Sequence, residues 1–293
     1  MGFSNKNAAK MISDYESWRT RIEIIGENNI SDGVEIAGNN VISKYGYYGK
    51  AVAWDVGDVH MKGGAGQMNT IYSWGTLKEA GIIFDMDGTL WDSTENITKA
   101  WNEVLVKYGY GQLKVTVEQV SKEMGKLMRD IADSLFKDIP ENIRYEIFEE
   151  CLSYENEYLF KNGANVYDGV EDVFKELNKK YNVFIVSNCQ EGYLRTFLEY
   201  YDFNKYVLDY EEAGRTGMPK DENIRLVIKR NHLDKAFYVG DTLGDMESAD
   251  KAEIPFIHAA YGFGTVPADR MKINNIKELP EFIDDLLSKD TDN

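Results

Sequence analysis

The sequence has little that would indicate a secreted, lipidated or membrane protein. Its 293 residues include two cysteines, Cys151 and Cys189, too few for a disulfide framework. No apolar run reaches the length of a membrane span, and the N-terminus lacks the basic and then apolar pattern of a signal peptide. Lys6 stands where a myristoylation motif requires Ser or Thr. We therefore expect a cytoplasmic protein with reduced thiols.

Positive charge is also scarce. The 50 Asp and Glu residues outnumber the 33 Lys and Arg residues, which gives a net charge of -17. This balance disfavours nucleic acid and anionic membranes as partners. A hydrophobic fraction of 43% and a charged fraction of 28% are typical of an ordinary globular protein, and the length allows one large domain or two smaller ones.

The most informative stretch is GIIFDMDGTL, at residues 81–90. Its apolar residues 82–84 predict a buried strand that stops at two carboxylates, Asp85 and Asp87. Gly88 then ends the strand and lets the backbone come close to a ligand. Two like charges at a buried strand end need a cation, or one of them must keep a proton.

Two later predicted strands also run directly into polar residues. The apolar residues 183–186 run into Ser187 and Asn188, and the strand at 236–239 runs into the pattern Gly-Asp-x-x-x-Asp at 240–245. The acids of that pattern, Asp241 and Asp245, are hard oxygen ligands for a divalent metal. Asp245 could also cap the helix that we expect at 246–251.

A single lysine lies between these two segments. Lys220 follows a proline at the start of a predicted helix, where a positive charge is poorly placed with respect to the helix dipole. A lysine in this position is normally directed into solvent, so a function for it rests on its order among the other motifs.

In their order along the chain, these four segments resemble the motifs of the haloacid dehalogenase superfamily, and in particular its phosphoglycolate phosphatase and β-phosphoglucomutase branch. The resemblance covers residues 80–285. It implies an α/β fold with a doubly wound, mostly parallel, Rossmann-like sheet and an all-helical cap inserted at about residues 95–165. Alternating strands and helices independently favour such a sheet, whose ligands bind at the carboxyl ends of the strands.

The resemblance also implies a hydrolase that removes the phosphoryl group from a small phosphorylated metabolite. Asp85 would be the nucleophile that forms an aspartyl-phosphate, and Asp87 the general acid and base. Lys220 and Ser187 would bind the phosphoryl oxygens, and Thr89 and Asn188 would help to shape the phosphate pocket.

A magnesium ion is the implied cofactor. Asp85, Asp241 and the backbone carbonyl of Asp87 would hold Mg²⁺, with Asp245 close by. The metal would neutralise charge and align the phosphoryl group with the nucleophile. Cys189, without a nearby histidine, and His258 are both expected to be structural.

The cap decides the substrate, and its sequence does not name one. Its helices are expected at 94–108, after a capping box at 116–119, and on to about residue 160. A break at 124–126 precedes Arg129. We expect the cap residues that reach the substrate to lie in this segment. Lys122, Lys126 and Arg129 have equal claims to a substrate role and to a solvated helix face.

Four other functions could use parts of this motif set. A dehalogenase would need neither Asp87 nor the metal acids, so these motifs argue against it. A phosphomutase keeps every motif, and a phosphonate hydrolase would need a cap lysine such as Lys122 or Lys126; both stay open. A non-catalytic protein would not need the intact set.

Residues 1–79 belong to no family that their sequence indicates, whereas residues 80–293 form the expected hydrolase core. The spacing at 8–25 predicts a helix, and short strands and turns or an irregular extension follow Gly26. The acids and histidine at 54–60 are interpreted as turn residues, and the glycines at 63–66 as a flexible turn rather than a phosphate loop. We expect this extension of unknown type to fold, to pack on the hydrolase core and to supply none of the motif residues; a small separate domain and a partner-binding module are both open.

Overall fold

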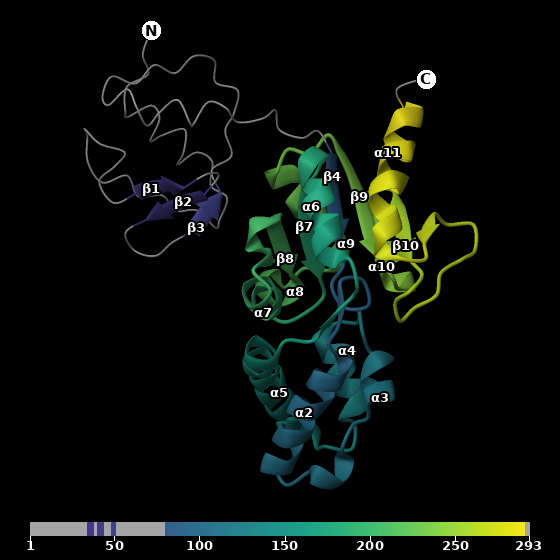
Figure 1. Ribbon diagram of the computed structural model, residues 1–293. Helices are drawn as coiled ribbons and strands as arrows, with labels where there is room; N and C mark the ends of the chain where they lie inside the picture. Colours follow the sequence, from purple (N-terminus) through teal and green to yellow (C-terminus); the bar gives the residue numbers. More distant parts are fainter. Residues whose placement is uncertain (1–33, 38–39, 44–47, 51–79, 291–293) are drawn as a thin grey trace. The chain divides into compact units, whose positions relative to one another are not determined.

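The computed structural model describes residues 34–37, 40–43, 48–50 and 80–290 (Figure 1). The chain divides into two compact units, Met1–Lys78 and Glu79–Asn293. In the first unit, an antiparallel sheet is formed by β1 (Val34–Ala37), β2 (Asn40–Ser43) and β3 (Tyr48–Lys50). Short strands were expected here. The predicted helix at 8–25 and the segments 54–60 and 63–66 lie outside the described residues.

The second unit is built on a sheet of six strands in the order β11-β10-β9-β4-β7-β8. The strands are β4 (Ala80–Phe84), β7 (Asn182–Ser187), β8 (Val207–Glu212), β9 (Lys235–Gly240), β10 (Phe256–Ala259) and β11 (Lys272–Ile273). Every neighbouring pair is parallel. The first strand, β4, lies in the middle and the chain winds outward from it in both directions. The predicted doubly wound α/β fold is confirmed, and this sheet is parallel throughout.

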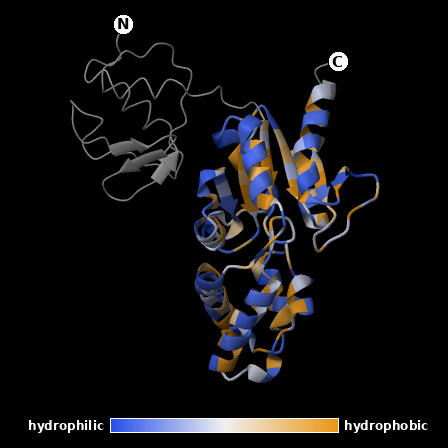
Figure 2. Ribbon diagram, in the orientation of Figure 1, coloured by the Kyte–Doolittle hydropathy of each residue, from blue (hydrophilic) through white to orange (hydrophobic). Residues whose placement is uncertain are grey.

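Successive side chains of the central strands enter two different cores, because strand residues point alternately to opposite faces. Ile82 and Phe84 pack with α6 (Val170–Lys180) and α11 (Leu279–Asp290). Ile83 packs in a second cluster with α9 (Lys220–Arg230) and α10 (Leu243–Ala252). Figure 2 shows the resulting hydrophobic strands between helices with hydrophilic outer faces. Helices on both faces explain why these strands are continuous apolar runs.

The remaining helices follow β4, β7 and β8. Four of them form an all-helical insertion: α2 (Thr94–Lys107), α3 (Val117–Ser121), α4 (Met128–Leu135) and α5 (Glu141–Asn162). Helix α7 (Tyr193–Tyr200) follows β7, and the short helix α8 (Ala213–Thr216) follows β8. The predicted capping box is present, because the Thr116 side chain accepts from the amide of Gln119 and the Gln119 side chain accepts from that of Thr116.

The insertion enters and leaves at one point. Its entry strand β5 (Trp91–Asp92) pairs antiparallel with its exit strand β6 (Asn165–Val166). The hydroxyl of Tyr201 donates to the carbonyl of Ala164 at 2.6 Å and accepts from its amide at 3.0 Å. We refer to the helical insertion as the cap. No described helix is long and apolar enough to span a membrane.

One expected element boundary was wrong. Helix α10 begins at Leu243 rather than at 246, and its N-cap is Thr242 rather than Asp245. The Thr242 hydroxyl accepts from the Asp245 amide, and Asp245 Oδ2 accepts from the Thr242 amide. Asp245 is therefore the third helical residue of a capping box, which fixes its carboxylate in place.

We expect residues 79–293 to fold without the preceding segment. The described members of both hydrophobic clusters lie within residues 80–287, so the shortened chain keeps all of them. The shortened chain should unfold in one cooperative transition, and its amide exchange in β4 should match that of the full chain. A molten chain without protected amides would contradict this division into units.

Candidate active site

A buried lysine joins two aspartates at the carboxyl edge of the sheet. Asp85 follows β4, Lys220 opens α9, and Asp245 lies in the first turn of α10. Lys220 Nζ is 2.8 Å from Asp85 Oδ1 and 2.5 Å from Asp245 Oδ1, and all three side chains are at most 2% exposed. The sequence left Lys220 with a possible solvent position, which the structure excludes.

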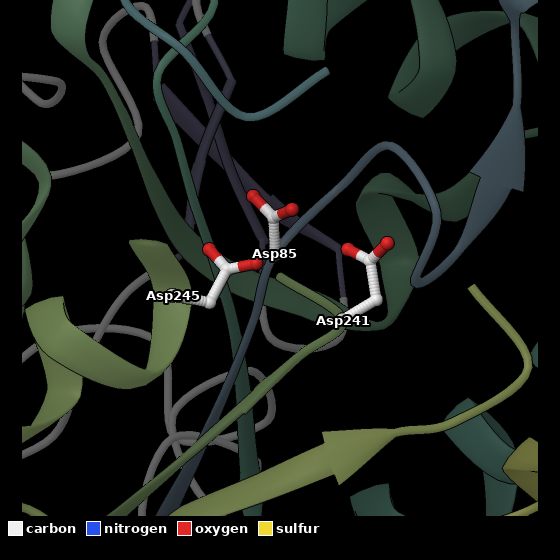
Figure 3. A group of neighbouring side chains, drawn as sticks. All are labelled: Asp85, Asp241 and Asp245. Atoms are coloured by element: carbon white, nitrogen blue, oxygen red, sulfur yellow. The ribbon is translucent and has the colours of Figure 1, made fainter. Parts of the chain in front are cut away.

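Asp241 completes this group from the end of β9. Its Oδ2 accepts from the backbone amides of Phe263, at 2.6 Å, and Gly264, at 3.3 Å. Thr89 Oγ1 lies 3.5 Å from Asp241 Oδ1. One carboxylate oxygen from each of Asp85, Asp241 and Asp245 lies within 4.8 Å of the others (Figure 3). Figure 3 shows the three carboxylates close to one another.

Gly88 is required at this edge. Its φ of +83° lies in the left-handed region, and a Cβ there would collide with the carboxylate of Asp241. The glycine thus lets the loop after β4 pass directly over Asp241. Close packing of this loop explains why a residue with no side chain separates Asp87 from Thr89.

The group has the charge and the atoms to hold a divalent ion. Burial, followed by the Asp245 carboxylate, raises the pKa values of both Asp85 and Asp241 above their usual range. Burial opposes the charge of Lys220, but the carboxylates of Asp245 and Asp85 outweigh it and raise its pKa well above the usual range. Three carboxylates and one ammonium leave an excess of two negative charges when ionised, and carboxylate oxygens are ligands that Mg²⁺ prefers.

Asp87 lies apart from the other three acids. Its Oδ1 accepts from Ser93 Oγ at 2.5 Å, Tyr193 OH at 2.7 Å and Trp91 Nε1 at 2.9 Å. Burial raises the pKa of Asp87 to about 6, although these three hydrogen bonds lower it. The carboxyl is therefore partly protonated near neutral pH. Sequence reasoning missed its three donors, although Trp91 and Ser93 lie only four and six residues beyond it.

The other predicted phosphate residues border a small cavity between the sheet edge and the cap. Ser187 and Asn188 line it together with Asp87, and its volume is about 30 Å³. Asn188 Nδ2 donates to the carbonyl of Gly125 at 2.9 Å, while its buried Oδ1 has no partner among the described residues. Thr89 thus lies beside Asp241, whereas Asn188 contacts the cap.

The three basic cap residues differ in position. Lys126 lines the cavity, as do Met124 and Gly125, so the break at 124–126 does reach the site. Lys122 pairs with Glu118 on an exposed helix face, and the Arg129 guanidinium lies 4.8 Å from the ring centroid of Tyr145. Lys122 therefore lies on a solvated helix face, and Arg129 packs against an aromatic ring.

Two residues that were expected to be structural differ in position: Cys189 lines the cavity, and His258 does not. Cys189 is buried, and burial raises the pKa of its thiol well above the usual value, so the thiolate needed for nucleophilic attack is suppressed. His258 Nε2 lies 3.2 Å from the backbone oxygen of Asp241. Its ring contacts the backbone of the loop after β9 and does not line the cavity described above.

Sequence reasoning missed Glu155, a cavity residue on cap helix α5. Its side chain is buried; Oε2 accepts from Trp101 Nε1 at 2.5 Å and Oε1 from Gln190 Nε2 at 2.9 Å. Burial raises its pKa to about 8, since those two hydrogen bonds offset only part of the desolvation. A signal was present: Glu155 continues the buried stripe of α5, whose other members are Ile147, Phe148, Cys151, Leu152 and Leu159.

The chain belongs to the haloacid dehalogenase-like hydrolase family. The profile of that family matches residues 82–259, more than half of the chain, and this span contains all of the acids, the lysine and the polar residues described above. The predicted resemblance is confirmed, and with it the expectation of an enzyme of the hydrolase class.

Individual proteins similar to this chain are consistent with the family assignment. A phosphoglycolate phosphatase from Rhodobacter capsulatus is 27% identical over 227 residues, which cover 69% of this chain and 96% of the relative. A 5'-nucleotidase from Pseudomonas aeruginosa is 24% identical over 204 residues, 64% of this chain and 86% of the relative. A crystal structure described as a predicted phosphatase from Clostridium acetobutylicum shares the fold, with a TM-score of 0.58, 23% identity and coverage of 71% and 99%.

The buried carboxyl of Glu155 should make stability fall as pH rises. Its folded-state pKa of about 8 exceeds the model-compound value of 4.5, so its contribution is full below pH 4.5 and is lost by about pH 8. In chelator, the free energy of unfolding of the natural chain, minus that of Glu155→Gln, should decrease over this interval. The slope is at most about 1.4 kcal/mol per pH unit.

Urea unfolding at pH 5, 6.5 and 8 measures this difference. Glu149→Gln removes an exposed carboxylate from the same helix and is the matched control for loss of one charge. A difference that stays constant between pH 5 and 8 would show that Glu155 is already ionised in the folded protein at pH 5.

Proposed function

We propose that this protein is a Mg²⁺-dependent phosphatase that hydrolyses a small phosphate monoester through an aspartyl-phosphate on Asp85. The observation that carries the proposal is the ion pair of Asp85 with the buried Lys220, beside Asp241 and Asp245. A nucleophilic carboxylate, a fixed cation and further acids at one strand edge are what phosphoryl transfer requires. Phosphatase relatives support the choice of a phosphate ester.

In the first step, one oxygen of the Asp85 carboxylate attacks phosphorus and the bond to the leaving oxygen breaks. Asp87 donates its proton to that oxygen, so an alcohol leaves rather than an alkoxide. The three hydrogen bonds to Asp87 all reach Oδ1, which leaves Oδ2 to carry the proton. Lys220 Nζ and the Ser187 hydroxyl stabilise the phosphoryl oxygens as their charge develops.

In the second step, a water molecule attacks the phosphorus of the aspartyl-phosphate. Asp87, now ionised, accepts a proton from the water, and the bond between phosphorus and the Asp85 oxygen breaks to release phosphate. Both carboxyl groups are thereby restored. The pKa of Asp87, raised to about 6 by burial, suits it to give a proton in one step and take one in the next.

Asp85, Asp241 and the backbone carbonyl of Asp87 would hold Mg²⁺. Asp245, which the α10 capping box fixes in place, would lie close by and hold Lys220 through their ion pair. The ion would neutralise charge on the phosphoryl group and help to orient it. The two amides that fix Asp241 Oδ2 leave Oδ1 directed toward the group. The described residues fit the ion in donor type and in charge.

A phosphomutase remains the second candidate, because it would use the same residues. What separates the two is the fate of the aspartyl-phosphate, which a mutase passes to a second sugar hydroxyl. Release of inorganic phosphate at the rate of substrate loss supports the phosphatase, whereas stoichiometric isomerisation without phosphate release would replace it.

Mg²⁺ should stabilise the protein and support turnover, and Ca²⁺ should inhibit. Mg²⁺ at about a hundred times its Kd should add about 2.7 kcal/mol to the free energy of unfolding. Ca²⁺ takes more and looser ligands, so it would engage both oxygens of Asp85 and turn the nucleophile away. Asp241→Asn should lose the stabilisation; Asp269→Asn, an exposed loop change, is the control. Full turnover in excess chelator would contradict the metal requirement.

The two aspartates of the first motif should be separable by leaving group. Asp85→Asn removes the nucleophile, so no substrate should yield a phosphoenzyme. Asp87→Asn keeps the nucleophile and loses the proton donor, so alkyl esters should slow by about a hundredfold to ten-thousandfold. An aryl phosphate leaves without a proton, and the aspartyl-phosphate should then accumulate in this variant because water attack is slow.

Intact mass after rapid acid quench detects the phosphoenzyme, and alkyl and aryl ester rates are measured in parallel. Asn at position 87 can still accept from Trp91, Ser93 or Tyr193, so the loop is retained. A phosphate adduct on Asp85→Asn, or an unchanged alkyl rate for Asp87→Asn, would refute these roles.

A further inference from the structure

The cavity beyond Asp87 is where a leaving group would lie, if the proposed function holds. Asp87, which would protonate the leaving oxygen, lines this cavity, and so do Glu155 and Gln190. Ile97, Trp101 and Ile131 form buried apolar walls. The cavity has a volume of about 30 Å³, which suits a leaving group of a few atoms.

The polar atoms of this cavity are mostly acceptors. Trp101 Nε1 and Gln190 Nε2 both donate to Glu155, and Gln190 Nε2 also donates to Asn156 Oδ1 at 3.0 Å. These bonds use two of the roughly four acceptor positions of the Glu155 carboxylate and leave the others for a ligand. Asn188 adds a second acceptor, its buried Oδ1 without a partner in the described part of the chain.

Positive charge is absent from the inner part of the cavity. Among the described residues that line it, the one cation is Lys126, which is 48% exposed and pairs with Glu123 Oε2 at 2.7 Å. Glu155 has no cationic partner among its described contacts. A substrate carboxylate placed here would lose its water and meet Glu155 without compensation, which is costly in a buried site.

We propose that Glu155, in its ionised form, is a specificity-determining residue that selects substrates whose leaving group carries a hydroxyl or ammonium, and that it rejects leaving groups that carry a carboxylate. This inference rests on the proposed function, because it uses the direction of attack at Asp85 and Asp87. It implies that the chain differs in substrate from its phosphoglycolate phosphatase relatives, although it shares their chemistry.

A matched series of three esters tests the proposal. The substrates 2-hydroxyethyl phosphate, 2-aminoethyl phosphate and 2-phosphoglycolate have the same length and differ in the terminal group. At pH 9, above the pKa of about 8 that burial gives Glu155, kcat/KM of the natural chain for each of the first two should exceed that for phosphoglycolate by about tenfold to a hundredfold, the range of a charge-assisted hydrogen bond. This comparison needs no variant and therefore does not depend on how a substitution affects folding.

Two variants then identify the group responsible. Glu155→Gln should reduce the preference for 2-aminoethyl phosphate over phosphoglycolate by about tenfold, mainly through KM, because a charged acceptor becomes a neutral one. Lys126→Met should leave the preference as it is. Glu149→Gln, on the exposed face of α5, should leave both rates unchanged.

Binding is measured separately with Asp85→Asn, which cannot turn over. Its affinities for the three esters by calorimetry should follow the same order. Preference for phosphoglycolate, or an unchanged preference in Glu155→Gln, would overturn this inference. Failure to hydrolyse even an aryl phosphate with Mg²⁺ would instead refute the proposed phosphatase, while the order of affinities would still decide the role of Glu155.

Discussion

The site depends on one buried ammonium between two carboxylates. Lys220 Nζ lies within 2.8 Å of Asp85 and 2.5 Å of Asp245, and all three groups are shielded from water. Without this cation, three acids at the edge of a parallel sheet would repel one another in a low dielectric, and at least one would bind a proton. The ion pair thus lowers the pKa of Asp85 against the opposing effects of burial and of Asp245, and so favours its anionic form. It also links α9 and α10 to β4, so the cluster is held by three separate elements.

Backbone geometry serves the same end. The loop after β4 crosses Asp241 at Gly88, and the loop that contains Phe263 and Gly264 turns two amides toward Asp241 Oδ2. A Cβ at Gly240 would meet the side chain of Asp245. Small residues at these crossings let charged groups approach one another, and the sheet supplies the rigidity that keeps them there.

The sheet edge was predictable from sequence because its signals are local. Each motif is an apolar run followed within a few residues by the group that acts, so strand ends placed Asp85, Asp241 and Ser187 without any knowledge of packing. Surroundings that come from distant parts of the chain were not predictable. Tyr193 reaches Asp87 from 106 residues away, and Trp101 reaches Glu155 across 54.

Glu155 shows most clearly what could not be predicted from the sequence. Many acids lie on α5, and only its place on the apolar stripe distinguishes this one. Such a position marks burial but says nothing of what the carboxylate faces, because that depends on how the cap lies over the sheet. The boundary of α10 was wrong for a related reason: Thr242 and Asp245 can each cap a helix, and only the geometry of the turn decides which does.

The paired strands β5 and β6 bring the two ends of the cap side by side, with Trp91 opposite Val166 and Asp92 opposite Asn165. An insertion whose ends already meet leaves the same two-stranded ribbon behind, whatever lies between them. The exchangeable part begins after Ser93, because Trp91 and Ser93 contact Asp87. Evolution, or an engineer, could graft a different helical module at these two points and alter the choice of substrate while the reacting groups stay in register.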